Sequence, residues 1–198
     1  MTSSTITTTA ATPKLQYIDA GANLLDSMYQ GTYHGKQRHE PDLDIVLARA
    51  FENGVNRIIS MAGTPKECEE TLKMIAELDQ QEHNKSDDER VKVFGTVGVH
   101  PTRCAEIFAE PCPSSSDEEE INWRPKTESE QTLILEQMVD LINQGKKSGN
   151  VVAVGGFGLD YARLQFCPKD IQILGFRKQL DMAIETQLPL YLHNRDSG

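Results

Sequence analysis

The sequence predicts an α/β chain built around a parallel sheet of about five strands. Short β-branched or apolar runs alternate with longer stretches of helical periodicity. No hairpin signal stands between consecutive runs, so each strand should return to the sheet through a helical crossover. The predicted strands are residues 15–20, 55–61, 91–98, 151–154 and 188–192.

Four helices are predicted between these strands. Thr64, followed by Pro65, is a typical helix start, and Gly54 is a typical helix end. Either Thr127 or Ser129 is placed to cap the third helix. The predicted helices are residues 43–51, 64–78, 127–145 and 171–184.

The length of 198 residues favours a single domain. Residues 1–14 are rich in Thr and Ser and are predicted to be a disordered tail. Residues 109–128, with three serines and a run of acids, are predicted to be an exposed insertion in the domain formed by residues 15–198. Since a closed barrel of eight βα units needs about 250 residues, the chain should hold about five of them.

Composition restricts the partners and the compartment. The net charge of -10 argues against a broad basic face for nucleic acid, although a bound divalent ion would supply local positive charge. No apolar run approaches the ~20 residues of a membrane span, so no membrane partner is expected. Four cysteines without CxxC spacing favour free thiols and a cytoplasmic or nuclear location. The oligomeric state is left open.

Polar side chains follow each predicted strand except the second. Because the carboxyl ends of parallel strands meet at one edge, these side chains are the candidate site. They are Asp19, Asn23, His100, Asp160, His193 and Arg195.

Structural roles for these residues stay open at this point. Asp19 and Asn23 also suit a turn, and His100 and His193 also suit structural histidines. Arg195 lies two residues after His193, so both should point to the same side of an extended strand. There Arg195 would bind a phosphate oxygen or form a salt bridge with Asp160 or Asp196.

Several motifs resemble those of the TatD-related, metal-dependent deoxyribonucleases, in the order found in that family, and the match is best with its eukaryotic branch. The first is Tyr17–Leu24, YIDAGANL, and the second is Val97–Pro101, VGVHP. The third is Gly155–Tyr161, GGFGLDY, which Leu190–Arg195, LYLHNR, follows. The resemblance implies a partial TIM-type (β/α)8 barrel of the metal-dependent hydrolase superfamily.

It also implies hydrolysis of DNA phosphodiester bonds, from a DNA end. In that family a Glu after strand four and a His after strand five hold divalent ions, together with a His and an Asp from later strands. Mg²⁺ or Mn²⁺ is the expected ion, with Zn²⁺ as an alternative. His193 matches the strand-five His, whereas the other five candidate residues are expected to line the site or contact DNA.

The main departure is Gly156, because the family has the metal-binding Glu at this position. The remaining ligands would lie beyond Gly198. We therefore expect a fragment that is incomplete at its C-terminus and binds metal weakly or not at all, and no residue is assigned as catalytic. Two alternatives stay open: a non-catalytic remnant or binding protein, and a metal-dependent hydrolase of another ester or amide.

Overall fold

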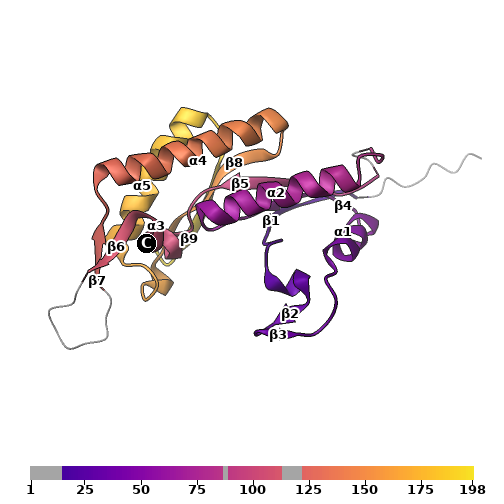
Figure 1. Cartoon of the computed structure of the whole chain (residues 1–198), viewed down its shortest axis with the longest axis horizontal. Coiled ribbons are helices and arrows are strands. Elements are labelled where there is room, and N and C mark those ends of the chain that lie inside the picture. The colour runs from indigo at the N-terminus through magenta and orange to yellow at the C-terminus, as the bar shows by residue number, and fades with distance from the viewer. Residues whose placement is uncertain (1–14, 87–88, 113–121) are drawn as a thin grey trace, which may run out of the picture.

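A computed structural model describes residues 15–86, 89–112 and 122–198. Its centre is a five-stranded parallel sheet whose strands lie side by side in the order of the sequence (Figure 1). This arrangement confirms the expected α/β class and the partial barrel of about five strands. The strands are β1 (Tyr17–Ala22), β4 (Val55–Ser60), β5 (Lys92–Val97), β8 (Val151–Asp160) and β9 (Leu190–Arg195).

The long helices begin where capping residues satisfy free backbone amides. The Thr64 hydroxyl accepts a hydrogen bond from the Glu67 amide, 3.2 Å away. Thr127, rather than Ser129, caps the third long helix and forms a capping box with Glu130. The helices are α1 (Leu43–Glu52), α2 (Pro65–Gln81), α3 (Cys104–Phe108), α4 (Glu128–Ser148) and α5 (Lys169–Thr186), with 3-10 turns at Ser27–Gln30, Pro101–Arg103 and Tyr161–Arg163.

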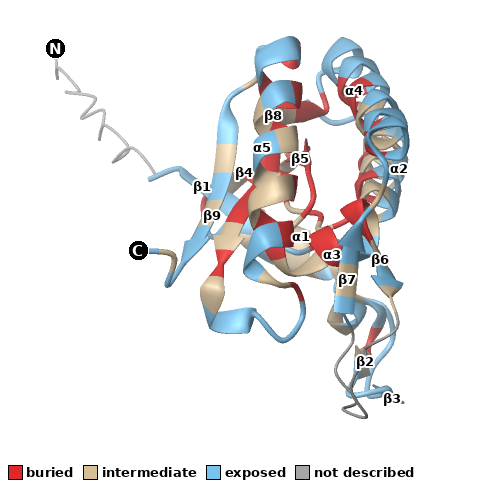
Figure 2. Ribbon diagram, turned by 90° about the vertical axis from the view of Figure 1, so that its left-hand side faces the viewer, coloured by how far each residue is buried: buried red, intermediate tan, exposed pale blue. Residues whose placement is uncertain are grey.

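The larger apolar core lies between β5, β8 and the helices α3, α4 and α5 (Figure 2). Phe108 and Phe157 are its largest fully buried side chains. A smaller cluster joins α1 and α2 to β4 and β5. Strand β8 is buried along most of its length, so it holds a fixed position at the centre of the fold.

The sheet is curved, so that its two edge strands approach each other on the inner side. A Cβ atom built on Gly21 of β1 would lie 2.7 Å from the hydroxyl oxygen of Tyr191, which belongs to β9. These strands stand at opposite edges of the sheet. The carboxyl ends of all five strands therefore surround a common space.

The expectation that Gly155–Gly158 ends the fourth strand is wrong. Strand β8 continues through these glycines to Asp160, because β9 pairs with it along that stretch and provides hydrogen-bond partners. Strands β1 and β9 also begin and end later than expected. Asp160, His193 and Arg195 are therefore strand residues rather than loop residues, whereas Asp19 lies in the first strand as expected.

The loops contain two hairpins that the sequence did not indicate. They pair β2 (Thr32–Tyr33) with β3 (Lys36–Gln37), and β6 (Ala109–Cys112) with β7 (Asn122–Pro125). The second hairpin forms the ends of the predicted insertion, and its Trp123 packs against the larger core. The acidic run between β6 and β7 and the predicted tail 1–14 lie outside the described residues. Among the helices described, none combines the length and the apolar character needed to cross a bilayer.

Candidate metal centre

Asp160 and His193 meet where β8 and β9 end. In the parallel pairing of these strands, Gly158 lies opposite His193 and Asp160 lies opposite Arg195. Gly158 has a φ of 149°, and a Cβ atom there would lie 1.9 Å from the His193 carbonyl oxygen. Only glycine allows this close approach. As a result, His193 Nε2 lies 3.3 Å from Asp160 Oδ2, and Arg195 Nη1 lies 3.8 Å from the same oxygen.

The Asp160 carboxylate is buried and incompletely satisfied. Its side chain is only 1% exposed, and neither oxygen accepts a hydrogen bond from the described residues. His193 Nε2 also lacks a hydrogen bond there. Arg195 at 3.8 Å compensates part of this charge, but a buried carboxylate whose lone pairs accept no hydrogen bond is still unfavourable. The arrangement therefore favours a bound cation between these side chains.

His100 completes a group of three donors. It follows β5, and its ring centroid lies 4.5 Å from that of His193 in an edge-to-face arrangement. One donor atom each from His100, Asp160 and His193 lie within 4.8 Å of one another. The sequence expected these residues at a common rim, and the structure brings them together.

The His100 ring is held in its neutral form. Burial and the neighbouring His193 lower the pKa of His100 to about 4, with smaller contributions from Arg163 and Arg195, although Asp160 opposes the shift. Nδ1 lies 2.7 Å from the Thr102 hydroxyl oxygen. The Thr102 amide also donates to Nδ1 at 3.3 Å, so Nε2 has the lone pair that a metal ion needs only in the tautomer in which Nδ1 carries the proton and donates to the Thr102 hydroxyl.

Two buried glutamines of α5 hold the backbone on either side of the three donors. Gln172 Oε1 accepts from the Asp160 amide at 2.7 Å, and its Nε2 donates to the Asp160 carbonyl at 3.0 Å. Gln179 makes the same pair of contacts with Val99, the residue before His100, at 2.6 and 3.1 Å. Helix α5 therefore fixes both ends of the site.

The donor set suits a divalent ion. Two imidazoles and one carboxylate are typical ligands of Zn²⁺ and of other transition metals, and they leave positions open for substrate. The buried oxygens of Asp160 without hydrogen bonds are the structural observation that fits such an ion. The sequence had placed only His193 among the metal ligands, because position 156 has no side chain to offer.

The remaining expected residues lie in different surroundings. Arg195 contacts Asp160, as one of the open alternatives proposed, and Asn23 lines a pocket beside His100. Asp19 does not belong to the three-donor group, since its Oδ1 accepts from the Gly21 amide within β1.

Sequence reasoning missed Gln172, Gln179 and Arg163. The two glutamines are seven residues apart on the apolar face of α5, where both are fully buried. Two polar residues at this spacing on an otherwise apolar helix face are the sequence pattern from which buried, hydrogen-bonded glutamines could have been predicted. Arg163 follows the Asp160 motif in a 3-10 turn and gave no comparable signal.

Similar proteins are known over most of the length of this chain. Residues 18–198 match the family model described as TatD related DNase. The chain is 33% identical over 183 residues to Deoxyribonuclease Tat-D of Schizosaccharomyces pombe, covering 92% of this chain and 49% of that protein. It is 27% identical over 179 residues to 3'-5' ssDNA/RNA exonuclease TatD of Salmonella typhimurium, covering 90% of this chain and 50% of that protein.

A solved structure gives the same result for the fold. The crystal structure of a TatD-family hydrolase from Entamoeba histolytica superposes with a TM-score of 0.68 and 34% identity, covering 92% of this chain and 50% of that one. The chain spans about half the length of the curated relatives named above. With a family model matched over nearly all of its length, this chain belongs to the TatD-related DNase family.

Proposed function

We propose that this chain takes part in the divalent-metal-dependent hydrolysis of DNA phosphodiester bonds, with the ion held by His100, Asp160 and His193. The observation that carries the proposal is the buried Asp160 carboxylate, whose oxygens accept no hydrogen bond among the described residues and face two imidazoles. The names of the relatives, a deoxyribonuclease and a 3'-5' ssDNA/RNA exonuclease, support DNA as the substrate and attack from a DNA end.

Each side chain has a defined part in this proposal. The neutral His100 ring offers a lone pair at neutral pH, because its pKa is about 4. Asp160 supplies negative charge, and Arg195, whose side chain is 45% exposed, is positioned to bind a phosphate oxygen. A bound divalent ion supplies Lewis-acid polarisation and stabilises charge that develops on the phosphate.

The donor types rank the possible ions. Imidazole suits Mn²⁺ and Zn²⁺ better than Mg²⁺, which prefers oxygen ligands. We therefore propose Mn²⁺ and Zn²⁺ as the first ions to test, followed by Mg²⁺. We also propose the cytoplasm or the nucleus as the compartment, which imaging of the tagged protein in cells of its source would test.

Single-stranded DNA labelled at one end, incubated with Mn²⁺ or Mg²⁺, tests the activity. We expect stepwise shortening of the strand by the chain, and loss of this activity in Asp160→Asn, whereas Asp181→Asn on the exposed side of α5 should behave like the unchanged chain. Absence of cleavage with every ion, while isothermal titration calorimetry also detects no ion binding, would overturn the proposal.

Gly156 favours a second candidate, a DNA-binding protein without hydrolytic activity. This residue has no donor atom, although it lines the space beside His100. Restoring the carboxylate with Gly156→Glu separates the two candidates. Hydrolysis by the unchanged chain supports the first candidate, whereas hydrolysis by Gly156→Glu alone supports the second. If neither chain cuts DNA but both bind it, the second candidate is favoured.

A further inference from the structure

A pocket of about 330 Å³ opens beside the three donors, and His100 forms part of its wall. Asn23, Thr102 and Arg163 provide polar groups, whereas Met61 and Ala62 provide an apolar side. The pocket therefore shares His100 with the candidate metal centre and combines charge, hydrogen-bonding groups and apolar surface. Ligand pockets in proteins share these features.

Arg163 is the available cation of this pocket. Arg103 also lines it, but Arg103 forms ion pairs with Glu106 at 2.8 Å and with Glu67 at 3.8 Å. Within the described part of the chain, the Arg163 guanidinium has neither an ion pair nor a hydrogen bond. Arg163 lines the same pocket as His100, so its charge lies beside the candidate metal centre. This guanidinium is therefore available to bind an anion that enters the pocket.

Gly156 leaves room in the pocket that a larger residue would fill. A Cβ atom at this position would meet the terminal methyl group of Met61 at 2.5 Å, and it would have no other contact within 4 Å apart from the adjoining residues. A larger residue would therefore displace the flexible end of the Met61 side chain and extend into the pocket. Gly156 therefore keeps this side of the pocket free of a side chain of its own.

We propose that this pocket binds one nucleotide of the DNA strand next to the bond that is cut. Arg163 holds the phosphate of that nucleotide through charge-assisted hydrogen bonds. Asn23 and Thr102 supply further hydrogen-bonding groups, and the base packs against the Met61 thioether and Ala62. The inference rests on the proposed function for the identity of the substrate, and it adds Arg163 as a substrate-binding residue.

Several features of the site support a nucleotide rather than a larger anion. The volume is at the lower end of the range for small-molecule pockets, about 300–1,000 Å³. The chain carries a net charge of -10, so a long polyanion must be held by local cations rather than by the whole surface. Arg163 and Arg195 both act on His100, which places two cations close to the three donors.

Binding of thymidine 5′-monophosphate, measured by calorimetry in EDTA, tests the pocket without any metal ion. We expect Arg163→Gln to weaken binding by about tenfold or more, because a charge-assisted hydrogen bond to phosphate is lost. Arg177→Gln removes the same charge from the exposed side of α5 and should leave binding unchanged. Equal affinities of the two variants would overturn the inference, as would the absence of any binding by the unchanged chain.

A second variant tests the pocket from its other wall. Gly156→Glu should also weaken nucleotide binding, since its side chain occupies the pocket and adds negative charge. If nucleotide binding depends on Arg163 but the chain never cuts DNA, the proposed function is wrong and the nucleotide-binding pocket is supported. If metal-dependent cleavage has the same KM in Arg163→Gln and Arg177→Gln, the proposed function is supported and the role of Arg163 in the pocket is wrong.

Discussion

The side-chain amide of Gln172 is hydrogen-bonded to both backbone polar groups of Asp160. Oε1 accepts from the Asp160 amide at 2.7 Å, and Nε2 donates to the Asp160 carbonyl at 3.0 Å and to the Cys167 carbonyl at 2.9 Å. Both side chains are fully buried. A residue of α5, twelve positions later in the chain, therefore holds the backbone from which the Asp160 carboxylate extends.

Gln172→Met should loosen this arrangement. The substitution keeps the volume but leaves buried backbone groups without partners, so we expect a loss of about 2–4 kcal/mol in the free energy of unfolding. Affinity for Mn²⁺ should fall as well, because Asp160 is no longer held. Urea unfolding and calorimetry measure the two effects. The matched control is Gln137→Met on the exposed side of α4, and equal values for both variants would refute the role of Gln172.

Asp160→Asn should separate metal binding from folding. In the metal-free protein this variant removes a buried charge that accepts no hydrogen bond, so its Tm should equal or exceed that of the unchanged chain. Added Mn²⁺ should raise the Tm of the unchanged chain, since it binds only the folded state, but not that of the variant. Thermal unfolding with and without Mn²⁺ measures this difference. A similar rise in both proteins would remove Asp160 from the metal site.

The fold was predictable from the sequence because its strands and helices have distinct periodicities. Apolar runs such as residues 55–61 and 91–98 became β4 and β5 with small changes at their ends. The glycine run after Val154 misled the prediction, since glycine normally interrupts a strand. Here the neighbouring strand β9 imposes the extended conformation, which no local pattern of β8 indicates.

The site was predictable only in part. The ends of three strands pointed to His100, Asp160 and His193, and parallel topology brings such ends together. The distances among them depend on the register of β8 with β9, which the sequence does not specify. The contacts of Gln179 with Val99 span 80 positions, so they depend on how α5 packs rather than on any local motif.

The stability of the metal-free protein should decrease as the pH falls from about 6.5 to about 4. The pKa of His100 is about 4 in the folded protein and 6.5 when unperturbed, so the unfolded chain binds more protons in this interval. Asp160, His193, Arg163 and Arg195 all act on the ring. His100→Gln should show a smaller decrease. Urea unfolding in EDTA across this interval measures it, and parallel curves for the two proteins would contradict the prediction.

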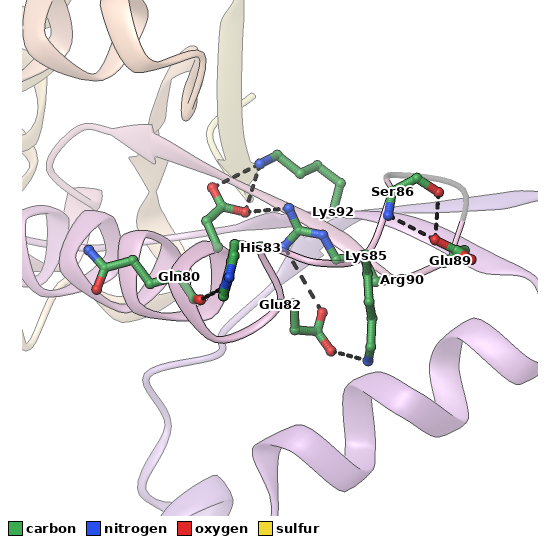
Figure 3. A network of polar contacts seen from close by, with 9 residues as sticks. Gln80, Glu82, His83, Lys85, Ser86, Glu89, Arg90 and Lys92 are labelled. Atoms are coloured by element: carbon green, nitrogen blue, oxygen red, sulfur yellow. Dashed lines mark hydrogen bonds and ion pairs between the residues drawn. The ribbon is translucent and has the colours of Figure 1, made fainter.

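A second pH effect concerns Asp79, which lies near the end of α2 and does not belong to the candidate site. Lys92 Nζ lies 2.8 Å from both of its carboxylate oxygens, and Arg90 Nη2 lies 2.8 Å from Oδ1. Figure 3 shows Lys92 and Arg90 within this network, where Glu82 also approaches Arg90. Burial alone would raise the pKa of Asp79, but the hydrogen bonds from Lys92 and Arg90 outweigh it and keep the pKa below its ordinary value of 3.8.

Asp79→Asn should therefore destabilise the protein near neutral pH and have less effect in acid. A lowered carboxylate pKa adds stability that is present above the unfolded pKa and is lost as the pH falls through the folded pKa. We expect a loss of about 1–2 kcal/mol at about pH 7, where the partly exposed carboxylate is charged, shrinking towards pH 3. Urea unfolding at both pH values measures it, with Asp140→Asn on the exposed side of α4 as the control. A loss of the same size at both pH values would show that Asp79 acts through packing instead of charge.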